Sequence, residues 1–294
     1  EIEISNELTT NFFKAIMAKN VFDNRERAKR EKTVMEILSP EATAKNKDKN
    51  CIICGAGPTL MDTIPLLKQH RDKFTILAVD SSLLPLYNNG IDPDLVLTID
   101  AAGECGEFLK GYSGKNAVLI ASASSHKNTS ENWSNQIYYY FPTPVKAFYY
   151  WLLMMLEYNR MPFLMPLNNC GSTSILLAED MGFKNIAFTG IDFSYPGNRF
   201  YAAGTNVEKA FGQSEADDEE KLLERLKGKA PIKTYDCKGN EVFTDSTFSF
   251  FARSLQNVVH TRKYKNLTNV GGGILKIPYM PFDEYLEKFI LNPK

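Results

Sequence analysis

The sequence predicts an α/β protein in which helices flank a parallel sheet and the N-terminus carries a helical appendage. From residue 51 onward, short apolar runs typical of strands alternate with longer amphipathic segments typical of helices. This alternation is the pattern of a parallel sheet covered on both faces. The expected strands span residues 51–54, 74–79, 95–99, 117–121, 136–140 and 186–190. The expected helices span residues 59–69, 82–89, 104–110, 144–157 and 173–182.

Two regions lie outside this alternation. Residues 1–48 have a helical apolar period, a charged stretch typical of a solvated face and a polar linker. We expect them to form an appendage to a domain at residues 49–294. Near the C-terminus, an acidic segment before Lys227 and an amphipathic segment at residues 247–260 each predict a helix. A run of three glycines at residues 271–273 predicts a flexible turn near the sheet or the ligand.

Composition bounds the class of protein. The chain has 294 residues, a net charge of -1 and 44% hydrophobic residues, which is ordinary for a soluble globular protein with one large core. The balanced charge lacks the basic excess typical of nucleic-acid binding. No window of about 18 apolar residues predicts a membrane span. Since no signal-peptide pattern is visible, we expect a cytoplasmic protein, and the start at Glu1 indicates a processed chain or a piece of a longer one.

The five cysteines do not suggest a disulfide framework, because their number is odd. Cys51 and Cys54 form a C-x-x-C pair, but the pair lies inside the first expected strand rather than at a helix start. We therefore expect both side chains to pack in the core instead of carrying redox chemistry. No second C-x-x-C or pair of histidines follows that would favour a zinc site.

Small, hydroxyl and acidic residues follow five of the expected strands. Ligands of parallel sheets bind at the carboxyl ends of strands, so these residues predict the rim of a site. The alternative for each one is that it caps the next helix. The residues at these ends include the glycine loop after strand 51–54, Asp80, Asp100, His126 and Asp192.

The first strand ends in Gly55-Ala56-Gly57-Pro58-Thr59, and an amphipathic segment follows. A turn of this kind exposes backbone N–H groups at a helix start, where a phosphate can dock. Pro58 suits the first helical turn, and the Thr59 hydroxyl is a further phosphate donor. The motif is neither a dinucleotide fingerprint nor a P-loop, because the third glycine and the Gly-Lys pair are missing. The alternative is a tight turn without a ligand.

A second helix start with small residues stands at residues 168–174, Asn-Asn-Cys-Gly-Ser-Thr-Ser. Its hydroxyls and N–H groups suit a carboxylate or a phosphate. The alternative is simple capping of the helix by Ser172 or Thr173. Two such helix starts at one rim favour an anionic ligand that is held at two points.

Two further candidates concern proton transfer and metal binding. His126 follows a strand end and is the best-placed histidine for a general base. Asp92 and Asp94 precede one strand and Asp100 ends it; the ligands of a Mg²⁺ site beside a diphosphate would be among these residues and Asp80. Asp100 alone equally suits a ribose, an amine or a helix cap. The residues do not decide between these roles.

Several motifs together resemble known families. Residues 168–202, including Gly-Phe-Lys-Asn-Ile before Gly-Ile-Asp-Phe, are similar to a segment of the short bacterial sialyltransferases, whose glycine loop resembles residues 55–59. The pattern resembles the motility accessory factor family more closely. That family shares a domain with 6-hydroxymethylpterin diphosphokinase MptE-like proteins. The resemblance covers about residues 50–278 and also rests on Asp92-Pro93-Asp94, residues 236–244 and residues 269–273.

The resemblance implies a Rossmann-like glycosyltransferase fold and a CMP-activated nonulosonic acid as donor, such as sialic, pseudaminic or legionaminic acid. It also implies roles for individual residues. Donor-binding positions carried over from it are Gly55, Gly57, Pro58, Thr59, Asp100, Gly171, Ser172 and Thr173; with them we group Asp80 at its strand end. Of two phosphate-contacting tyrosines, one matches Tyr201, and the other falls on Ser194 beside Tyr195. The general-base histidine of the sialyltransferases has no counterpart within residues 202–259, so Asp192 is the candidate proton acceptor beside His126.

Three hypotheses follow for the activity. The first is transfer of a nonulosonic acid from its CMP donor to Ser or Thr of a protein such as flagellin, with no cofactor and no metal required. The second is transfer of pyrophosphate from ATP to a pterin alcohol, with Mg²⁺ on the aspartates. The third is a non-catalytic nucleotide-binding module. The sugar, the acceptor and the oligomeric state stay open.

Overall fold

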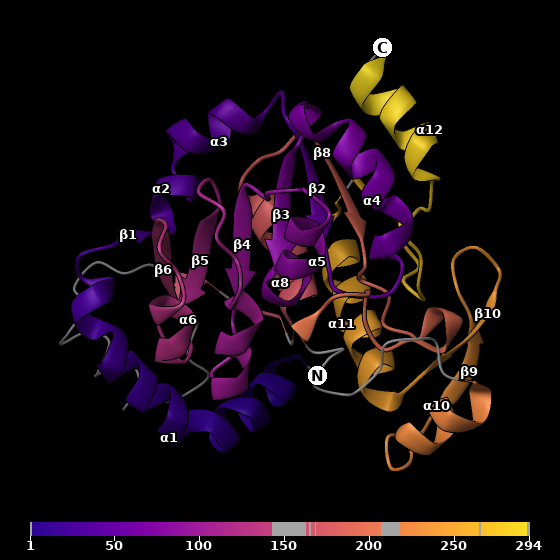
Figure 1. Cartoon of the computed structure of the whole chain (residues 1–294), viewed down its shortest axis with the longest axis horizontal. Coiled ribbons are helices and arrows are strands. Elements are labelled where there is room, and N and C mark those ends of the chain that lie inside the picture. The colour runs from indigo at the N-terminus through magenta and orange to yellow at the C-terminus, as the bar shows by residue number, and fades with distance from the viewer. Residues whose placement is uncertain are drawn as a thin grey trace.

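The computed structural model describes residues 2–142, 163–164, 166–167, 169–206, 218–264 and 266–292 (Figure 1). It confirms the predicted Rossmann-like α/β fold: a parallel sheet lies at the centre and helices cover it. The expected helix at residues 144–157 lies outside the described residues. Among the described helices, none combines the length and the apolar character needed to cross a membrane.

The central sheet is parallel throughout, with the strand order β1-β6-β5-β4-β3-β2-β8-β11 and β7 paired to β6. Successive strands step in one direction from β2 to β6, and the chain then returns to place β8 on the opposite side of β2. The sheet thus has its topological switch point between β2 and β8. The strands are β1 Lys32–Thr33, β2 Asn50–Cys54, β3 Thr75–Val79, β4 Leu95–Thr98, β5 Val118–Ser122, β6 Ile137–Pro142, β7 Phe163–Leu164, β8 Asn185–Thr189 and β11 Leu267–Asn269.

The two faces of the sheet belong to two separate cores, because side chains alternate along each strand. In β2, Ile52 and Cys54 face the core formed with α4 (Leu60–Gln69), α5 (Leu83–Asn88) and α12 (Phe282–Leu286). Cys51 and Ile53 face the core formed with α8 (Cys170–Asp180) and α11 (Ser246–Arg262). Both cysteines are fully buried, as predicted. Burial raises the pKa of both thiols.

The N-terminal segment differs from the predicted helical appendage in one respect. Its helices are α1 (Ile2–Ala28), α2 (Met35–Leu38) and α3 (Pro40–Asn46), but Lys32 and Thr33 form the edge strand β1 beside β6. A strand of two residues has no detectable period, which is why the sequence did not reveal it. The helix α1 lies beside α6 (Lys127–Glu131), and the buried amides of Asn20 and Asn24 donate to carbonyls of residues 101 and 123–125.

Other elements differ from the predictions in type or bounds, and the strands β9, β10 and β11 were not predicted. The expected helix at residues 104–110 is a 3₁₀ helix, η3 (Gly103–Leu109), one of several short turns that also include η1 (Arg71–Lys73), η2 (Asp80–Ser82) and η4 (Pro196–Asn198). The acidic helix is α10 (Glu219–Arg225), and a hairpin of β9 (Ile232–Tyr235) and β10 (Glu241–Thr244) stands beside it (Figure 1). A π-helical turn at Glu287–Leu291 ends the described chain.

Candidate functional site

A cavity of about 300 Å³ opens at the carboxyl ends of β2, β3, β4 and β8, at the switch point of the sheet. Parallel sheets bind their ligands at this place, because the connections after the two strands run to opposite faces of the sheet and leave a crevice between them. The described lining consists of residues 55–57, 79–81, 100, 108, 169–171, 190–194, 200, 201, 248 and 251. Four of the five rim segments predicted from the strand ends therefore meet in one cavity; the segment with His126 does not.

The glycine loop after β2 packs tightly against the loop after β8. The Gly55 N–H donates to the Thr189 carbonyl and the Gly57 N–H to the Gly190 carbonyl, both at 2.8 Å. A Cβ on Gly55 would lie 2.2 Å from the Gly190 oxygen, so a larger residue does not fit. The prediction that these N–H groups are exposed to a phosphate is therefore wrong for Gly55 and Gly57, although both residues line the cavity.

The start of α8 supplies the open N–H groups that the glycine loop lacks. Asn169 caps this helix, since its Oδ1 accepts from the Ser172 N–H at 2.8 Å. Cys170 and Gly171 occupy the first two helical positions, where N–H groups have no partner within the helix, and both line the cavity. An anion is favoured at such a helix end.

Two residues of this helix start are placed differently from the prediction. Thr173 Oγ1 turns to the carbonyls of Leu167 and Asn169, and Ser172 is 2% exposed. Neither belongs to the described lining of the cavity. The capping alternative for Ser172 or Thr173 is also wrong, because Asn169 takes that position.

Asp192 anchors the glycine loop from the opposite side. Its carboxylate accepts hydrogen bonds from the N–H and the hydroxyl of Thr59. Burial raises the pKa of the Asp192 carboxyl to about 6, against the lowering effect of the Thr59 bonds. Asp192 lines the cavity, so a group able to exchange a proton near neutral pH stands at its wall.

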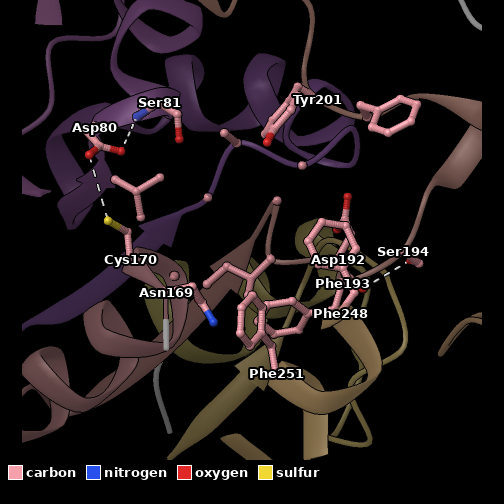
Figure 2. A pocket seen from close by; sticks show the side chains of 18 of the residues that line it. Asp80, Ser81, Asn169, Cys170, Asp192, Phe193, Ser194, Tyr201, Phe248 and Phe251 are labelled. Atoms are coloured by element: carbon pink, nitrogen blue, oxygen red, sulfur yellow. Dashed lines mark hydrogen bonds between the residues drawn. The ribbon is translucent and has the colours of Figure 1, made fainter. Parts of the chain in front are cut away.

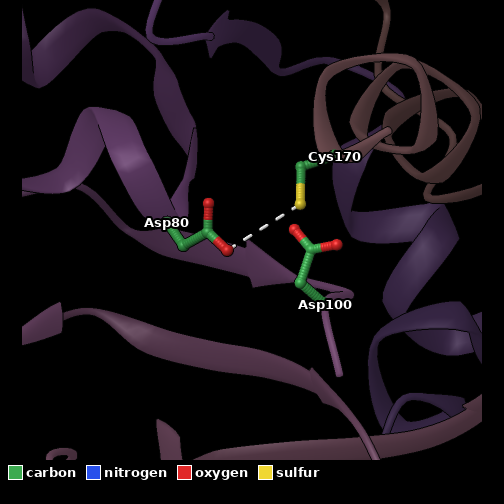
Figure 3. A group of neighbouring side chains, drawn as sticks. All are labelled: Asp80, Asp100 and Cys170. Carbon is green, nitrogen blue, oxygen red and sulfur yellow. Dashed lines mark hydrogen bonds between the residues drawn. The ribbon is translucent and has the colours of Figure 1, made fainter. Parts of the chain in front are cut away.

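Asp80 and Asp100 form an acidic wall with Cys170 (Figure 3). One oxygen or sulfur atom of each of the three lies within 4.8 Å of the others. Asp80 is 2% exposed and accepts from Thr98 Oγ1 at 2.8 Å and the Ser81 N–H at 2.7 Å. Burial, and then the charge of Asp100, raise the Asp80 pKa to about 7. Asp100 faces the open cavity, and incomplete solvation there also raises its pKa.

Aromatic rings form the opposite wall (Figure 2). Phe193, Phe248 and Phe251 lie together across the cavity from Asp80, and Tyr201 lies at a third side. Phe193 packs edge-on against both Phe248 and Phe251, at centroid distances of 6.1 and 6.2 Å. The backbone of Phe193 has φ 46°, a left-handed conformation that is strained for a bulky residue and is typical of functional loops.

Three predicted residues lie away from the cavity. Thr59 is 6% exposed and is held by Asp192, while Pro58 precedes the helix α4 instead of opening it. Tyr195 is 1% exposed and donates its hydroxyl to Asp245 at 2.6 Å. None of the three belongs to the described lining of this cavity, so they are not placed to contact a ligand in it.

His126 also lies apart from the cavity. Its Nδ1 accepts from the Asn128 N–H at 3.3 Å, which caps the short helix α6, and its ring lies beside Gly103. The strand before it, β5, is separated from the switch point by β4 and β3. The capping interpretation of this strand end is the correct one, so His126 is not placed as a general base for a ligand in the cavity.

The four aspartates of the proposed magnesium site are divided between the two ends of the sheet. Asp94 precedes β4, pairs with Arg71 at 2.9 Å and accepts the Ile76 N–H at 2.7 Å. Asp92 accepts the hydroxyl of Tyr112. Only Asp80 and Asp100 reach the cavity, because they follow strands instead of preceding one. Of the four candidate Mg²⁺ ligands, Asp92 and Asp94 are therefore not placed at the cavity, whereas Asp80 and Asp100 are.

Several lining residues were not predicted as site residues. Asn169 and Cys170 belong to the motif at residues 168–174, but we predicted ligand contacts for its hydroxyl residues Ser172 and Thr173 instead. The Phe248 and Phe251 rings stand three residues apart on α11, which is the spacing of one helix face. That spacing is also typical of a core stripe, so no signal in the sequence assigned these rings to a ligand.

Comparison with a solved glycosyltransferase structure supports the fold. The structure of the MAf glycosyltransferase from Magnetospirillum magneticum AMB-1 superposes with a TM-score of 0.57 and 16% identity, over 86% of this chain and 39% of that one. A mammalian sialyltransferase in complex with Gal-beta-1-3GalNAc-ortho-nitrophenol aligns over 71% of this chain and 83% of its own, at 10% identity and a TM-score of only 0.34.

The sequence itself matches a protein family over most of the sheet. An uncharacterized protein of Treponema pallidum (strain Nichols) is 35% identical over 65 residues, which is 22% of this chain and 31% of that protein. The chain thus spans well under half of the length of either the treponemal protein or the MAf glycosyltransferase. Residues 19–198, more than half of the chain, match the family described as 6-hydroxymethylpterin diphosphokinase MptE-like. The chain belongs to this MptE-like family, as its motifs predicted.

Proposed function

We propose that the chain is a glycosyltransferase that moves a nonulosonic acid from a CMP donor to a hydroxyl group, with Ser or Thr of a protein such as flagellin as the acceptor. One observation carries the proposal: the start of α8, the acidic wall, Asp192 and Tyr201 face a single cavity at the switch point of the sheet. The resemblance to motility accessory factors and the shared fold with the MAf glycosyltransferase support it.

The cavity offers a partner for each part of such a donor. The phosphate of CMP lies at the N–H groups of Cys170 and Gly171, where the helix end stabilises its charge. The ribose hydroxyls donate to Asp80 and Asp100, and the base packs against the rings of Phe248 and Phe251. These contacts hold the donor so that its sugar points toward Asp192 and Tyr201.

The transfer itself needs one proton acceptor and one stabilised leaving group. The bond between the anomeric carbon and the phosphate oxygen of CMP breaks, and a bond from that carbon to the acceptor oxygen forms. The acceptor proton passes to the Asp192 carboxylate, which is mostly ionised above its pKa of about 6. The hydroxyl of Tyr201 donates to the departing CMP.

A thermal-shift panel tests this function on the whole chain. The ligands are CMP, CDP, ATP with Mg²⁺, and 6-hydroxymethylpterin. We expect CMP and CDP to raise the melting temperature and ATP with pterin to leave it unchanged, because a ligand that binds the native state stabilises it by mass action. Stabilisation by ATP, Mg²⁺ and pterin without any effect of CMP would refute the proposal.

One observation favours pyrophosphoryl transfer from ATP as a second candidate. Asp80 and Asp100 stand close enough to share a cation, and the family description names a diphosphokinase. Two carboxylates suit Mg²⁺, which keeps several waters in its shell, whereas the Cys170 thiol is a poor ligand for it. If this candidate holds, EDTA abolishes the shift produced by ATP; under the first proposal, EDTA leaves the shift produced by CMP intact.

A further inference from the structure

A second cavity of about 380 Å³ adjoins the first. Phe200, Tyr201 and Phe248 line both cavities, so the two spaces share these three residues as a common wall. Arg225 at the end of α10 and Lys229 shortly after it also line the second cavity, and neither belongs to the described lining of the first. A substrate seated in the first cavity therefore has a second compartment directly beside it.

Hydrogen bonds fix the inner part of this compartment. The Tyr195 hydroxyl donates to Asp245 Oδ2 at 2.6 Å, and Asp245 Oδ1 accepts the Phe248 N–H at 2.8 Å as the cap of α11. Both carboxylate oxygens of Asp245 are thus engaged within the protein. The Ser246 N–H donates to the Lys229 carbonyl at 3.3 Å, which ties the segment after α10 to the start of α11.

The two cavities differ in charge. The first is lined by the carboxyl groups of Asp80, Asp100 and Asp192. The described lining of the second includes the cations Arg225 and Lys229, and the one carboxylate in that described lining, Asp245, is buried and hydrogen-bonded. The Lys229 ammonium lies 6.0 Å from the centroid of the Phe200 ring. Aromatic side chains beside cations suit a ring-shaped ligand with a negative group. The ring of the ligand packs on the aromatic side chains, and its negative group pairs with the cations.

We infer that the second cavity binds a sugar ring bearing a carboxylate, with the carboxylate at Arg225 and Lys229 and the ring against Phe200 and Tyr201. The inference deepens the proposed function and rests on it, since it supplies a place for an acidic sugar beside the nucleotide site. The acidic sugar belongs either to the donor or to the acceptor, and both present the same chemistry to these residues.

Glucuronate and glucose form the matched probe pair, since they differ only in a carboxylate against a hydroxymethyl group. Their binding to the full chain is measured by ligand-observed NMR. The variants Arg225→Ala and Lys229→Ala each remove one charge from the cavity, and Lys227→Ala removes one exposed charge from the same segment outside it. Thermal melts confirm that the variants fold. We expect glucuronate to bind more tightly than glucose, and each cavity variant, but not Lys227→Ala, to weaken it roughly three- to tenfold.

A second series assigns the source of the carboxylate, with CMP and CMP-N-acetylneuraminate as ligands. If both cavity variants weaken CMP-N-acetylneuraminate and leave CMP unaffected, the anion belongs to the donor sugar. If they weaken only glucuronate, the anion belongs to the acceptor. Equal binding of glucose and glucuronate, or equal losses in Lys227→Ala and Lys229→Ala, overturns the inference. Absence of CMP binding while glucuronate still depends on Arg225 and Lys229 refutes the proposed function but keeps this subsite.

Discussion

The aspartates at the two ends of the parallel sheet differ in their partners and in their pKa values. At the amino end of β4, Asp94 has an ion pair with Arg71 and a backbone donor, and Asp92 has the Tyr112 hydroxyl. At the carboxyl ends of β3 and β4, Asp80 and Asp100 stand near each other, and their pKa values are raised. Carboxylates that are paired with donors stabilise a fold. Carboxyl groups whose pKa is raised by burial and by a neighbouring acid are typical of a ligand site.

The largest difference between the ends is expected in ligand binding. Asp100→Asn keeps the size of the side chain but removes a charged acceptor from the cavity wall. We expect the affinity for CMP to fall about tenfold to a hundredfold, because hydrogen bonds to charged groups are the stronger ones. Isothermal titration calorimetry measures this, and unchanged affinity would remove Asp100 from the ligand site.

A substitution at the other end of β4 tests the role of the aspartates there. Asp94→Ala leaves the Ile76 N–H and the Arg71 guanidinium without this partner. We expect a loss of about 1–3 kcal/mol in the free energy of unfolding, since the N–H group loses its acceptor, and no change in the CMP affinity of the folded protein. Urea denaturation gives the first quantity and calorimetry the second. A loss of CMP affinity comparable to that of Asp100→Asn would abolish the distinction between the two ends.

A substitution in the aromatic wall is expected to have a smaller effect on CMP binding, and the neighbouring residue offers a control. Phe251 lines the cavity, and its neighbour Phe250 does not belong to the described lining. We expect Phe251→Leu to weaken CMP binding roughly threefold to tenfold, because ring packing is lost, and Phe250→Leu to leave it unchanged. The same titration compares the two variants, and equal effects would mean that packing of α11, not contact with the base, is responsible.

A further difference is expected in the pH dependence of stability. Burial raises the folded-state pKa of Asp80 to about 7, above the unfolded value of about 3.9. The folded protein therefore binds this proton more tightly, and the resulting stabilisation is present below about pH 4 and is lost as the pH rises through 7. In Asp80→Asn this contribution is absent. Melting temperatures of both proteins from pH 4 to 8 should diverge across this window, and parallel curves would contradict the raised pKa.

The sequence predicted the sheet well because buried parallel strands leave apolar runs such as residues 51–54, which lie within β2. It missed the short strands β1, β7 and β11, since two or three residues carry no detectable period. It located the cavity through the ends of four strands, which topology brings together. It failed where tertiary contacts decide: Thr59 turns to Asp192, His126 caps α6, and Phe251 arrives from a distant helix. Asp192 and Phe251 are distant in sequence from the residues they meet, so no local pattern reports them, whereas the cap at His126 is local and is one of two roles that the same pattern allows.

The central claim is that the cavity at the switch point holds a cytidine nucleotide. A crystal structure of the chain with CMP tests it most directly. We predict density for the nucleotide in this cavity, with its phosphate at the N–H groups of Cys170 and Gly171 and its ribose at Asp80 and Asp100. A cavity without nucleotide at saturating CMP, or CMP bound at another place on the chain, would contradict the account.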